Sequence, residues 1–303
     1  MLRYVVKRVG LAALTVFIIT AITFFTMNAI PGGPFSKEKA PSEAVKAVLE
    51  ARFNLDKSVP EQYILYLGNI LQGDFGVSIK TGRDIALTIT ESFAISARLG
   101  GMAVVVALSV GLVMGSLAAL TRNKLPDRLI IFFSTLSTAV PSFVLATLLL
   151  LVFSIQLGWI QVWSAESTNY ILPVIALSLY PMAYITRLTK SSMLDALGQD
   201  YIRTAKAKGV SQWKIIFKHA LRNALIPIVT YVGPMTAYIL TGSLVVESVF
   251  TIGGLGSKFV SGITNRDYPM IMATTIFLAT LMVIANLISD LVYKLVDPRI
   301  SFD

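Results

Sequence analysis

Six long runs without a charged residue dominate the pattern of hydrophobic and polar positions along the chain. Each run has at least the ~20 residues that an α-helix needs to cross the hydrocarbon core of a bilayer. The pattern predicts an all-α integral membrane protein with six transmembrane helices, and hence both termini on one side. The runs are Val9 to Ile30, Leu99 to Thr121, Leu129 to about Leu157, Ser167 to Thr186, Asn223 to Val246 and Tyr268 to Ser289. The first exceeds the ~7 to 15 apolar residues of a cleaved signal, so we expect it to remain as a span.

Residues 31–98 form the only sizeable polar section, between the first and second runs. Periodic apolar positions predict short amphipathic helices at Ser42 to Phe53 and around Tyr63 to Leu71, and a stripe of Ile85, Ile89 and Phe93 leads into the second span. Because this section is small and lightly apolar, we expect a cap packed over the helix bundle rather than an independent enzyme. The predicted layout is residues 1–30 with the first span, the cap at 31–98 and a core of five spans at 99–303.

Lys and Arg orient the predicted spans. With the N-terminus in the cytoplasm, the inside segments hold 16 of the 26 basic residues, and the long 31–98 section holds eight of the remainder. Long loops are translocated largely regardless of charge, so the short loops decide the orientation. They predict cytoplasmic N- and C-termini, and they place the basic segment 198–227 in the cytoplasm.

Composition agrees with a membrane protein. Mean hydropathy is +0.72, 55% of residues are hydrophobic and only 14% are charged, against about 25% charged in soluble domains. A net charge of +9 is compatible with nucleic-acid binding, but the distribution of the basic residues favours the cytoplasmic face of a bilayer. The chain has no cysteine and one histidine, which excludes disulfides and thiolate metal sites.

The basic segment at residues 198–227, called the coupling loop below, separates the fourth and fifth runs. Gly198 is suited to a left-handed helix cap and Asp200 to the N-cap of a following helix. That helix is expected to end near Lys208, because Gly209 supplies a turn at no Cβ cost. Ser211 is suited to cap a second helix. Ile202 and Ala205 share one face of the first helix, and Trp213, Ile216, Phe217 and Ala220 follow a helical stripe on the second.

Two interpretations fit this loop. A basic amphipathic helix pair can lie on anionic lipid headgroups, or it can dock against a cytoplasmic protein. The spacing resembles the loop shared by membrane subunits of ATP-binding cassette importers, whose pattern is Glu-Ala-Ala, three residues, Gly, nine residues, then Ile-x-Leu-Pro. Arg203, Thr204 and Ala205 stand at its first three positions, Gly209 at the glycine, and His219, Leu221 and Arg222 at its last three.

The segments YIRTAKAKG and HALRNA are similar to the corresponding segments in the peptide and nickel branch of that family. PGGPF (31–35), GDFGVS (73–78) and NRDYP (265–269) also resemble the B-type permeases of oligopeptide importers, so the resemblance covers nearly the whole chain. It implies the type I importer permease fold with a small extracytoplasmic cap between helices 1 and 2, in the cytoplasmic (inner) membrane. It also implies a non-catalytic subunit that moves oligopeptides by alternating access.

The partners implied by the resemblance are a second, similar permease, two cytoplasmic ATPases that bind ATP and Mg, and an extracytoplasmic peptide-binding protein. This chain itself would hold no cofactor or metal. Gly209 would permit the turn and Ala205 a close approach, with Ile202, Trp213 and Phe217 as apolar contacts and Arg203, Lys206 and Lys208 as charged ones. The full set expected to couple to the ATPase is Ile202, Arg203, Thr204, Ala205, Lys206, Lys208, Gly209, Trp213, Phe217, His219 and Leu221.

Prolines and small polar residues cluster in the third to fifth runs. They are compatible with ordinary kinks and Ser/Thr packing between helices, or with a water-filled cavity that satisfies freed backbone groups. As a set they are our candidates for lining the transport pathway: Ser137, Thr138, Pro141, Ser142, Ser178, Pro181 and Pro234.

Two acidic residues end the last two runs, Glu247 and Asp290. They fit structural caps or ion pairs, or proton and cation sites. No G-x-x-x-x-G-K-[ST], G-x-S-x-G or His-Glu-x-x-His motif is present, so we expect no ATP site and no hydrolase. Two rival functions remain: a permease for nickel or another metal chelate, and a stand-alone ion-coupled secondary transporter using Glu247 or Asp290.

Overall fold

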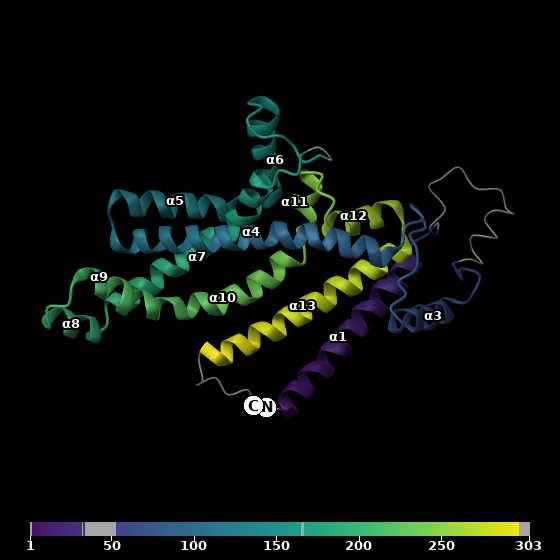
Figure 1. Ribbon diagram of the computed structural model, residues 1–303, viewed down its shortest axis with the longest axis horizontal. Helices are drawn as coiled ribbons and strands as arrows, with labels where there is room; N and C mark the ends of the chain where they lie inside the picture. Colours follow the sequence, from purple (N-terminus) through teal and green to yellow (C-terminus); the bar gives the residue numbers. More distant parts are fainter. Residues whose placement is uncertain (1, 32, 34–52, 165–166, 297–303) are drawn as a thin grey trace. The chain divides into compact units, whose positions relative to one another are not determined.

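The computed structural model describes residues 2–31, 33, 53–164 and 167–296. Regular structure within these ranges is helical apart from one antiparallel bridge, between Val77 and Asp84 (Figure 1). The helix expected at Ser42 to Phe53 lies outside the described residues except for Phe53, and so does most of the PGGPF motif.

Five helical segments are long and apolar enough to cross a membrane, and a bent pair of helices would make a sixth. This confirms the all-α membrane fold expected from the hydrophobic pattern. The five segments are Val6–Ala29, Ile85–Leu120, Ile171–Leu197, Gln212–Val249 and Tyr268–Ser289, and the bent pair is Leu125–Ala139 with Ser142–Gln156.

The bent pair corrects the prediction of one continuous third span. Helix α5 (Leu125–Ala139) is followed by α6 (Ser142–Leu149) and the π-helix η1 (Leu150–Gln156), with a bend of 105° at the break. Proline forces the residue before it out of the helical region, and Val140 is accordingly extended, with φ −88° and ψ 130°. Pro141 then takes the N-cap position of α6. The third apolar run therefore contains two helical segments that point in different directions.

The chain divides into two compact units. Unit 1 comprises residues 1–96 and 253–284, and unit 2 comprises residues 97–252 and 285–302. Unit 1 contains α1 (Leu2–Ala29), α3 (Val59–Leu71), α12 (Leu255–Asn265), the start of α4 (Ile85–Leu120) and most of α13 (Tyr268–Val296).

Unit 1 has two apolar clusters. Phe24 and Met27 of α1 meet Tyr63 of α3 and Tyr268 and Met272 of α13 in the first cluster. The second joins α4, α12 and α13 through Ile85, Ile89, Leu255, Met270 and Ala273, with Phe93 packed against it. The stripe Ile85, Ile89, Phe93 therefore faces a protein core, as its spacing predicts.

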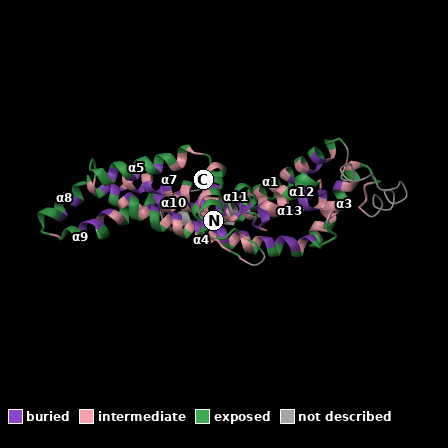
Figure 2. Ribbon diagram, turned by 90° about the horizontal axis from the view of Figure 1, so that it is seen from above, coloured by how far each residue is buried: buried purple, intermediate pink, exposed green. Residues whose placement is uncertain are grey.

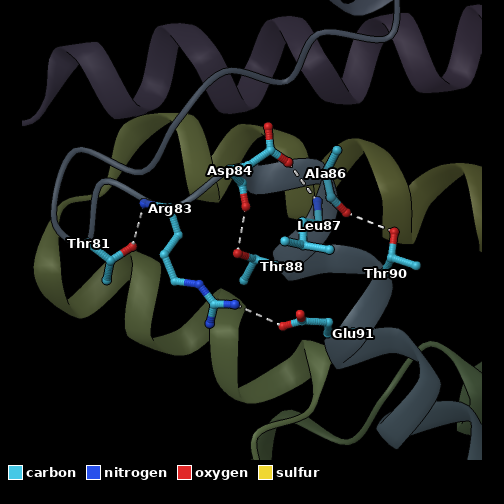
Figure 3. A network of polar contacts seen from close by, with 8 residues as sticks. All are labelled: Thr81, Arg83, Asp84, Ala86, Leu87, Thr88, Thr90 and Glu91. Atoms are coloured by element: carbon cyan, nitrogen blue, oxygen red, sulfur yellow. Dashed lines mark hydrogen bonds and ion pairs between the residues drawn. The ribbon is translucent and has the colours of Figure 1, made fainter.

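Side-chain hydrogen bonds stabilise the N-terminal ends of α3 and α4 in unit 1. At α3, the carboxylate of Glu61 accepts hydrogen bonds from the hydroxyl (2.8 Å) and backbone N–H (3.1 Å) of Ser58, and the hydroxyl in particular lowers the pKa of Glu61. At α4, Asp84 caps the helix by accepting from the backbone N–H of Leu87 at 2.8 Å (Figure 3). An exposed ion pair between Arg83 and Glu91 at 3.1 Å spans this first part of α4 (Figure 3).

Three motifs far apart in the sequence meet in unit 1. The hydroxyl of Ser78, in GDFGVS, donates to Asp267 of NRDYP at 2.5 Å, and the backbone N–H of Ile79 donates to the same carboxylate at 3.2 Å. The guanidinium of Arg266 donates to the carbonyl oxygens of Pro31 (3.0 Å) and Gly33 (3.3 Å) in PGGPF. The buried contacts of Asp267 therefore fix the 73–84 loop against the start of α13.

Unit 2 contains the remainder of α4 with α5, α6, α7 (Ile171–Leu197), α10 (Arg222–Leu240) and α11 (Leu244–Val249). Helix α7 packs against both α5 and α10. The central apolar cluster takes Ala103 and Ala107 from α4, Ile185 from α7, and Ile228 and Ile239 from α10. The fifth run is interrupted between α10 and α11, where Gly242 has φ +92°.

Glycine allows α4 and α7 to approach closely. A Cβ atom added at Gly115 would lie 2.5 Å from the carbonyl oxygen of Thr186 and 2.5 Å from the Cβ of Thr189. One added at Gly111 would lie 2.8 Å from Cγ2 of Ile185. These separations are far below van der Waals contact, so two turns of α4 depend on glycine. Small residues at such crossings let helix backbones approach within a bilayer.

We expect Gly115→Ala to destabilise the protein by about 1–3 kcal/mol, because the added methyl group overpacks the α4–α7 crossing. The measurement is unfolding in mild detergent, followed by circular dichroism. Gly101→Ala is the matched control, since Gly101 lies on the same helix with no atom within 4 Å of its added Cβ. Equal stability of the two variants would contradict the close crossing.

Candidate functional site

The coupling loop connects α7 to α10 in unit 2 and contains α8 (Asp200–Ala207), α9 (Gln212–Lys214) and the π-helix η2 (Ile215–Leu221). In Figure 1, α8 and α9 lie together beyond the same ends of α7 and α10. Gly209 has φ +72°, which confirms the turn expected between the two helices. Ser211 stands at the N-cap of α9, but its hydroxyl makes no capping hydrogen bond.

Two cap predictions are wrong, one for the end of α7 and one for the start of α8. Gly198 ends α7 with φ −80° and ψ −12°, in the right-handed region. The N-cap of α8 is Gln199, and Asp200 is the first helical residue. Asp200 still lies in the first turn, where a carboxylate interacts favourably with the helix dipole.

The inner side of the coupling loop forms a continuous apolar core. Ile202 of α8 and Ile215 of η2 are almost fully buried, with Ala205, Ile216 and Ala220 beside them. The same cluster includes Met193 and Ala196 of α7 and Ala224 of α10. The loop is therefore packed onto the ends of both helices. This corrects the expectation that Ile202 and Ala205 contact a partner, because both side chains are buried within this chain.

The outer side carries an exposed aromatic pair. Trp213 is 72% exposed and Phe217 is 55% exposed, and their rings stack with centroids 5.3 Å apart and an interplanar angle of 7°. Helix α9 is exposed throughout, whereas α8 has exposed residues on both sides of the buried Ile202 and Ala205 (Figure 2). The π-helix explains why Phe217 separates from Ile216 and Ala220: its i→i+5 hydrogen bonding departs from the 3.6-residue period on which the predicted stripe depends.

Exposed basic residues precede and follow this pair in the sequence of the loop. Arg203, Thr204, Lys206 and Lys208 are exposed, whereas His219 and Leu221 are half-buried. Asn223 connects the two ends of the loop, because its amide donates to the hydroxyl of Tyr201 at 2.8 Å and to the carbonyl oxygen of His219 at 3.1 Å. An exposed apolar pair among cations is typical of an interaction surface. It can bind an acidic protein surface or anionic lipid headgroups.

The structure separates the residues proposed to line a pathway. Ser178 and Pro181 are buried within unit 2, while Pro141, Ser142 and Pro234 are exposed. Ser137 and Thr138 are half-buried, and their hydroxyls donate to carbonyl oxygens of their own helix at 2.9 Å. The seven residues therefore do not share one surface in this conformation.

Tyrosines on α7 and α10 form an aromatic face that the sequence analysis missed. Tyr184 of α7 stacks on Tyr231 of α10 with centroids 4.2 Å apart. Tyr180 on α7 and Tyr238 on α10 are 55% and 71% exposed. The signal available in the sequence was the four-residue spacing of Tyr180 and Tyr184, which places them on one side of a helix.

A buried ion pair was also missed. Lys190 of α7 lies 2.5 Å from a carboxylate oxygen of Asp127 on α5, and only 6% of the Asp127 side chain is exposed. The other carboxylate oxygen accepts from the backbone N–H of Asn123 at 2.9 Å. Sequence offered a weak signal, an acid among the basic residues before the third run. The pair connects α5 to α7.

Glu247 is fully buried in α11, and the side chain of Asp290 lies outside the described residues. In the described part of the chain, no group of three or more His, Cys, Asp or Glu residues could hold a metal ion.

Comparisons with known proteins agree with this architecture. Residues 111–302 match the family described as "Binding-protein-dependent transport system inner membrane component", and residues 1–100 match the N-terminal region of the membrane component of such systems. A solved amino acid ABC transporter shares the fold with a TM-score of 0.52 at 19% identity, covering 68% of this chain and 93% of that one.

Two curated relatives match end to end. The dipeptide transport system permease protein DppB of Bacillus subtilis is 47% identical, covering 99% of this chain and 98% of the relative. The oligopeptide transport system permease protein OppB of Haemophilus influenzae is 42% identical, covering all of both chains.

We expect Lys190→Met to destabilise the protein by about 3–5 kcal/mol, because the variant leaves the carboxylate of Asp127 buried without its cation. Adding Asp127→Asn should recover most of that loss, since asparagine keeps the acceptor for Asn123 without the charge. Unfolding in detergent gives both values.

The matched control for this ion pair is Arg203→Met. It breaks the exposed Arg203–Asp200 pair at 3.3 Å, whose side chains are 77% and 93% exposed, so its effect should be below about 1 kcal/mol. A Lys190 variant as stable as this control would refute the role of the buried pair.

Proposed function

Because the chain belongs to the family of binding-protein-dependent transport system inner membrane components, we propose that it is the permease subunit of an ATP-driven importer of short peptides. The peptide assignment rests on its two full-length relatives, which are named for dipeptide and oligopeptide transport. The chain is a multi-pass membrane component of the transport system. In the proposal it is non-catalytic, binds neither ATP nor metal, and has both termini in the cytoplasm.

The exposed stack of Trp213 on Phe217 is the observation that carries the coupling part of the proposal. In water this apolar surface is costly, and burial against a partner removes that cost. The partners proposed for the assembly are two cytoplasmic ATPases, a second permease of the same family and an extracytoplasmic peptide-binding protein. The exposed Arg203, Lys206 and Lys208 give the same loop positive charge, which favours an acidic surface on the ATPase.

The apolar core of the coupling loop suggests how motion is transmitted. Ile202 and Ile215 pack against Met193 of α7 and Ala224 of α10, so a displacement of α8 or η2 moves the ends of both helices. The same two helices carry the stacked pair Tyr184 and Tyr231. We propose that closure of the ATPases, acting on this core, alternately exposes the tyrosine face to the two sides of the membrane.

Reconstitution tests the whole proposal. The chain, co-expressed with its genetic neighbours and placed in proteoliposomes, should take up labelled di- and tripeptides only with ATP inside and binding protein outside. Uptake of nickel chelates instead would reassign the substrate. Uptake driven by an ion gradient without any ATPase would overturn the importer assignment.

Trp213→Ala should reduce co-purification of the ATPase at least tenfold, because it removes the larger ring of the exposed stack. Trp159→Ala is the matched control: Trp159 is 71% exposed, as Trp213 is, but lies outside the coupling loop. A gentle-detergent pull-down with ATPase assayed in the eluate gives the result. If the two variants retain the ATPase equally, the stack is not the docking surface.

Gly209→Asp should uncouple uptake from ATP hydrolysis while leaving the protein in the membrane. A side chain at φ +72° strains the turn, and the strain displaces α8 from α9. The readouts are ATPase activity and peptide uptake by the same proteoliposomes. Gly198→Asp serves as the control, since Gly198 has φ −80°. Normal uptake by the Gly209 variant would contradict the assignment.

A further inference from the structure

Unit 1 contains a cavity of about 270 Å³, apart from the coupling loop and the tyrosine face. Its walls come from the end of α1, from residues 53–55, from α3, from the loop of residues 74–79 and from the first residues of α13. In the proposed topology, the part of unit 1 that holds this cavity is extracytoplasmic. The volume is slightly below the ~300 Å³ at which pockets for drug-sized ligands begin, so it suits one or two amino-acid residues.

Aromatic rings form much of the wall, from five separate segments: Phe24, Phe53, Tyr66, Phe75 and Tyr268. The hydroxyl of Tyr66 is buried without a hydrogen-bond partner among the described residues, and burial raises its pKa well above the ordinary value. Tyr66 therefore stays uncharged. Such a wall accommodates an apolar side chain and also attracts a cation to the ring faces.

Several polar groups of the wall offer acceptor oxygens. The amide nitrogen of Asn28 donates to the carbonyl oxygen of Phe24 at 3.0 Å, and that of Gln62 donates to the carbonyl oxygen of Lys57 at 2.9 Å. Among the described residues no donor bonds to the side-chain oxygen of either, so each offers an acceptor beside its second N–H. One carboxylate oxygen of Asp74 accepts from the backbone N–H of Gly76 at 2.8 Å, and the other accepts no hydrogen bond from the described residues.

Among the described residues, the wall carries only negative charge. Asp74 is its ionisable acid, and the described residues that line the cavity include no Lys, Arg or His. Asn54 and Asn69 add carboxamides that can both donate and accept. A ligand with a positive donor group, a neighbouring amide and an apolar side chain matches all of these features. Asp74 is exposed, so its carboxylate can bind the ammonium group at the mouth of the cavity while the apolar side chain enters among the rings.

We propose that this cavity binds the N-terminal residue of a short peptide, with the ammonium group on Asp74 and the side chain among the aromatic rings. The ligand class rests on the proposed function, and the cavity deepens it by giving the permease a peptide contact of its own. In this arrangement Asn69 pairs with the first peptide group. A peptide leaving the binding protein would be held at its amino end before transport.

The test is calorimetric titration of the purified full-length chain in nanodiscs with Phe-Ala and with N-acetyl-Phe-Ala. The free dipeptide should bind at least tenfold more tightly than the acetylated one, because acetylation removes the positive charge. Equal binding of the two would overturn the proposal and indicate an unspecific apolar cavity.

Asp74→Asn should weaken binding of Phe-Ala at least fivefold, while keeping the acceptor for Gly76. Asp56→Asn is the matched control, because Asp56 is exposed and does not line the cavity. Asn69→Lys should weaken binding similarly by placing a cation beside the ammonium group. Its control is Leu71→Lys, on the same helix at 88% exposure and outside the lining. Unchanged binding by both cavity variants would overturn the proposal.

Uptake by the assembled importer separates the two proposals. ATP-driven peptide uptake, together with no preference of the isolated chain for the free amino terminus, overturns the cavity assignment alone. Selective binding that is lost in Asp74→Asn supports the cavity, whereas absence of ATP-driven peptide uptake overturns the proposed function.

Discussion

The need to satisfy every backbone N–H and C=O group within a bilayer governs this structure. Hydrocarbon offers these groups no partners, so each long apolar run forms helix, whose hydrogen bonds are internal. Hydroxyl groups within the spans also bond to backbone carbonyl oxygens of their own helix. Thr186 donates to the carbonyl oxygen of Met182 at 2.8 Å and Thr274 to that of Met270 at 2.6 Å. A hydroxyl satisfied in this way is less available to a substrate. Polarity within a span is therefore a poor guide to a transport pathway.

Breaks in the helices matter as much as the helices themselves. Pro141 divides the third apolar run at an angle of 105°, and Gly242 with φ +92° separates α10 from α11. Irregular backbone at membrane depth is tolerated where protein or water satisfies it. These breaks confer changes of direction that a bundle of six straight helices would lack.

The coupling loop combines a rigid inner side with an exposed outer side. Its inner residues, such as Ile202 and Ile215, belong to the same core as the ends of α7 and α10. Its outer residues Trp213 and Phe217 stack on each other and face away from that core. A surface built in this way can receive a partner without losing its connection to the membrane helices. In unit 1, Asp267 plays a comparable part, because it anchors the loop of Ser78 from a position 189 residues away.

The sequence alone determined the class of fold, because hydrophobic length and the absence of charge are sufficient to specify membrane helices. It also located the coupling loop and its turn, since a positive φ at Gly209 follows from local chemistry. Tertiary structure alone decided which apolar face of that loop is buried. Amphipathic spacing marks an apolar face without identifying what covers it, and so Ile202 was expected at a partner yet packs within this chain. The contacts between Asp127 and Lys190, and between Ser78 and Asp267, were likewise beyond prediction, because they join segments whose proximity depends on the packing of several helices.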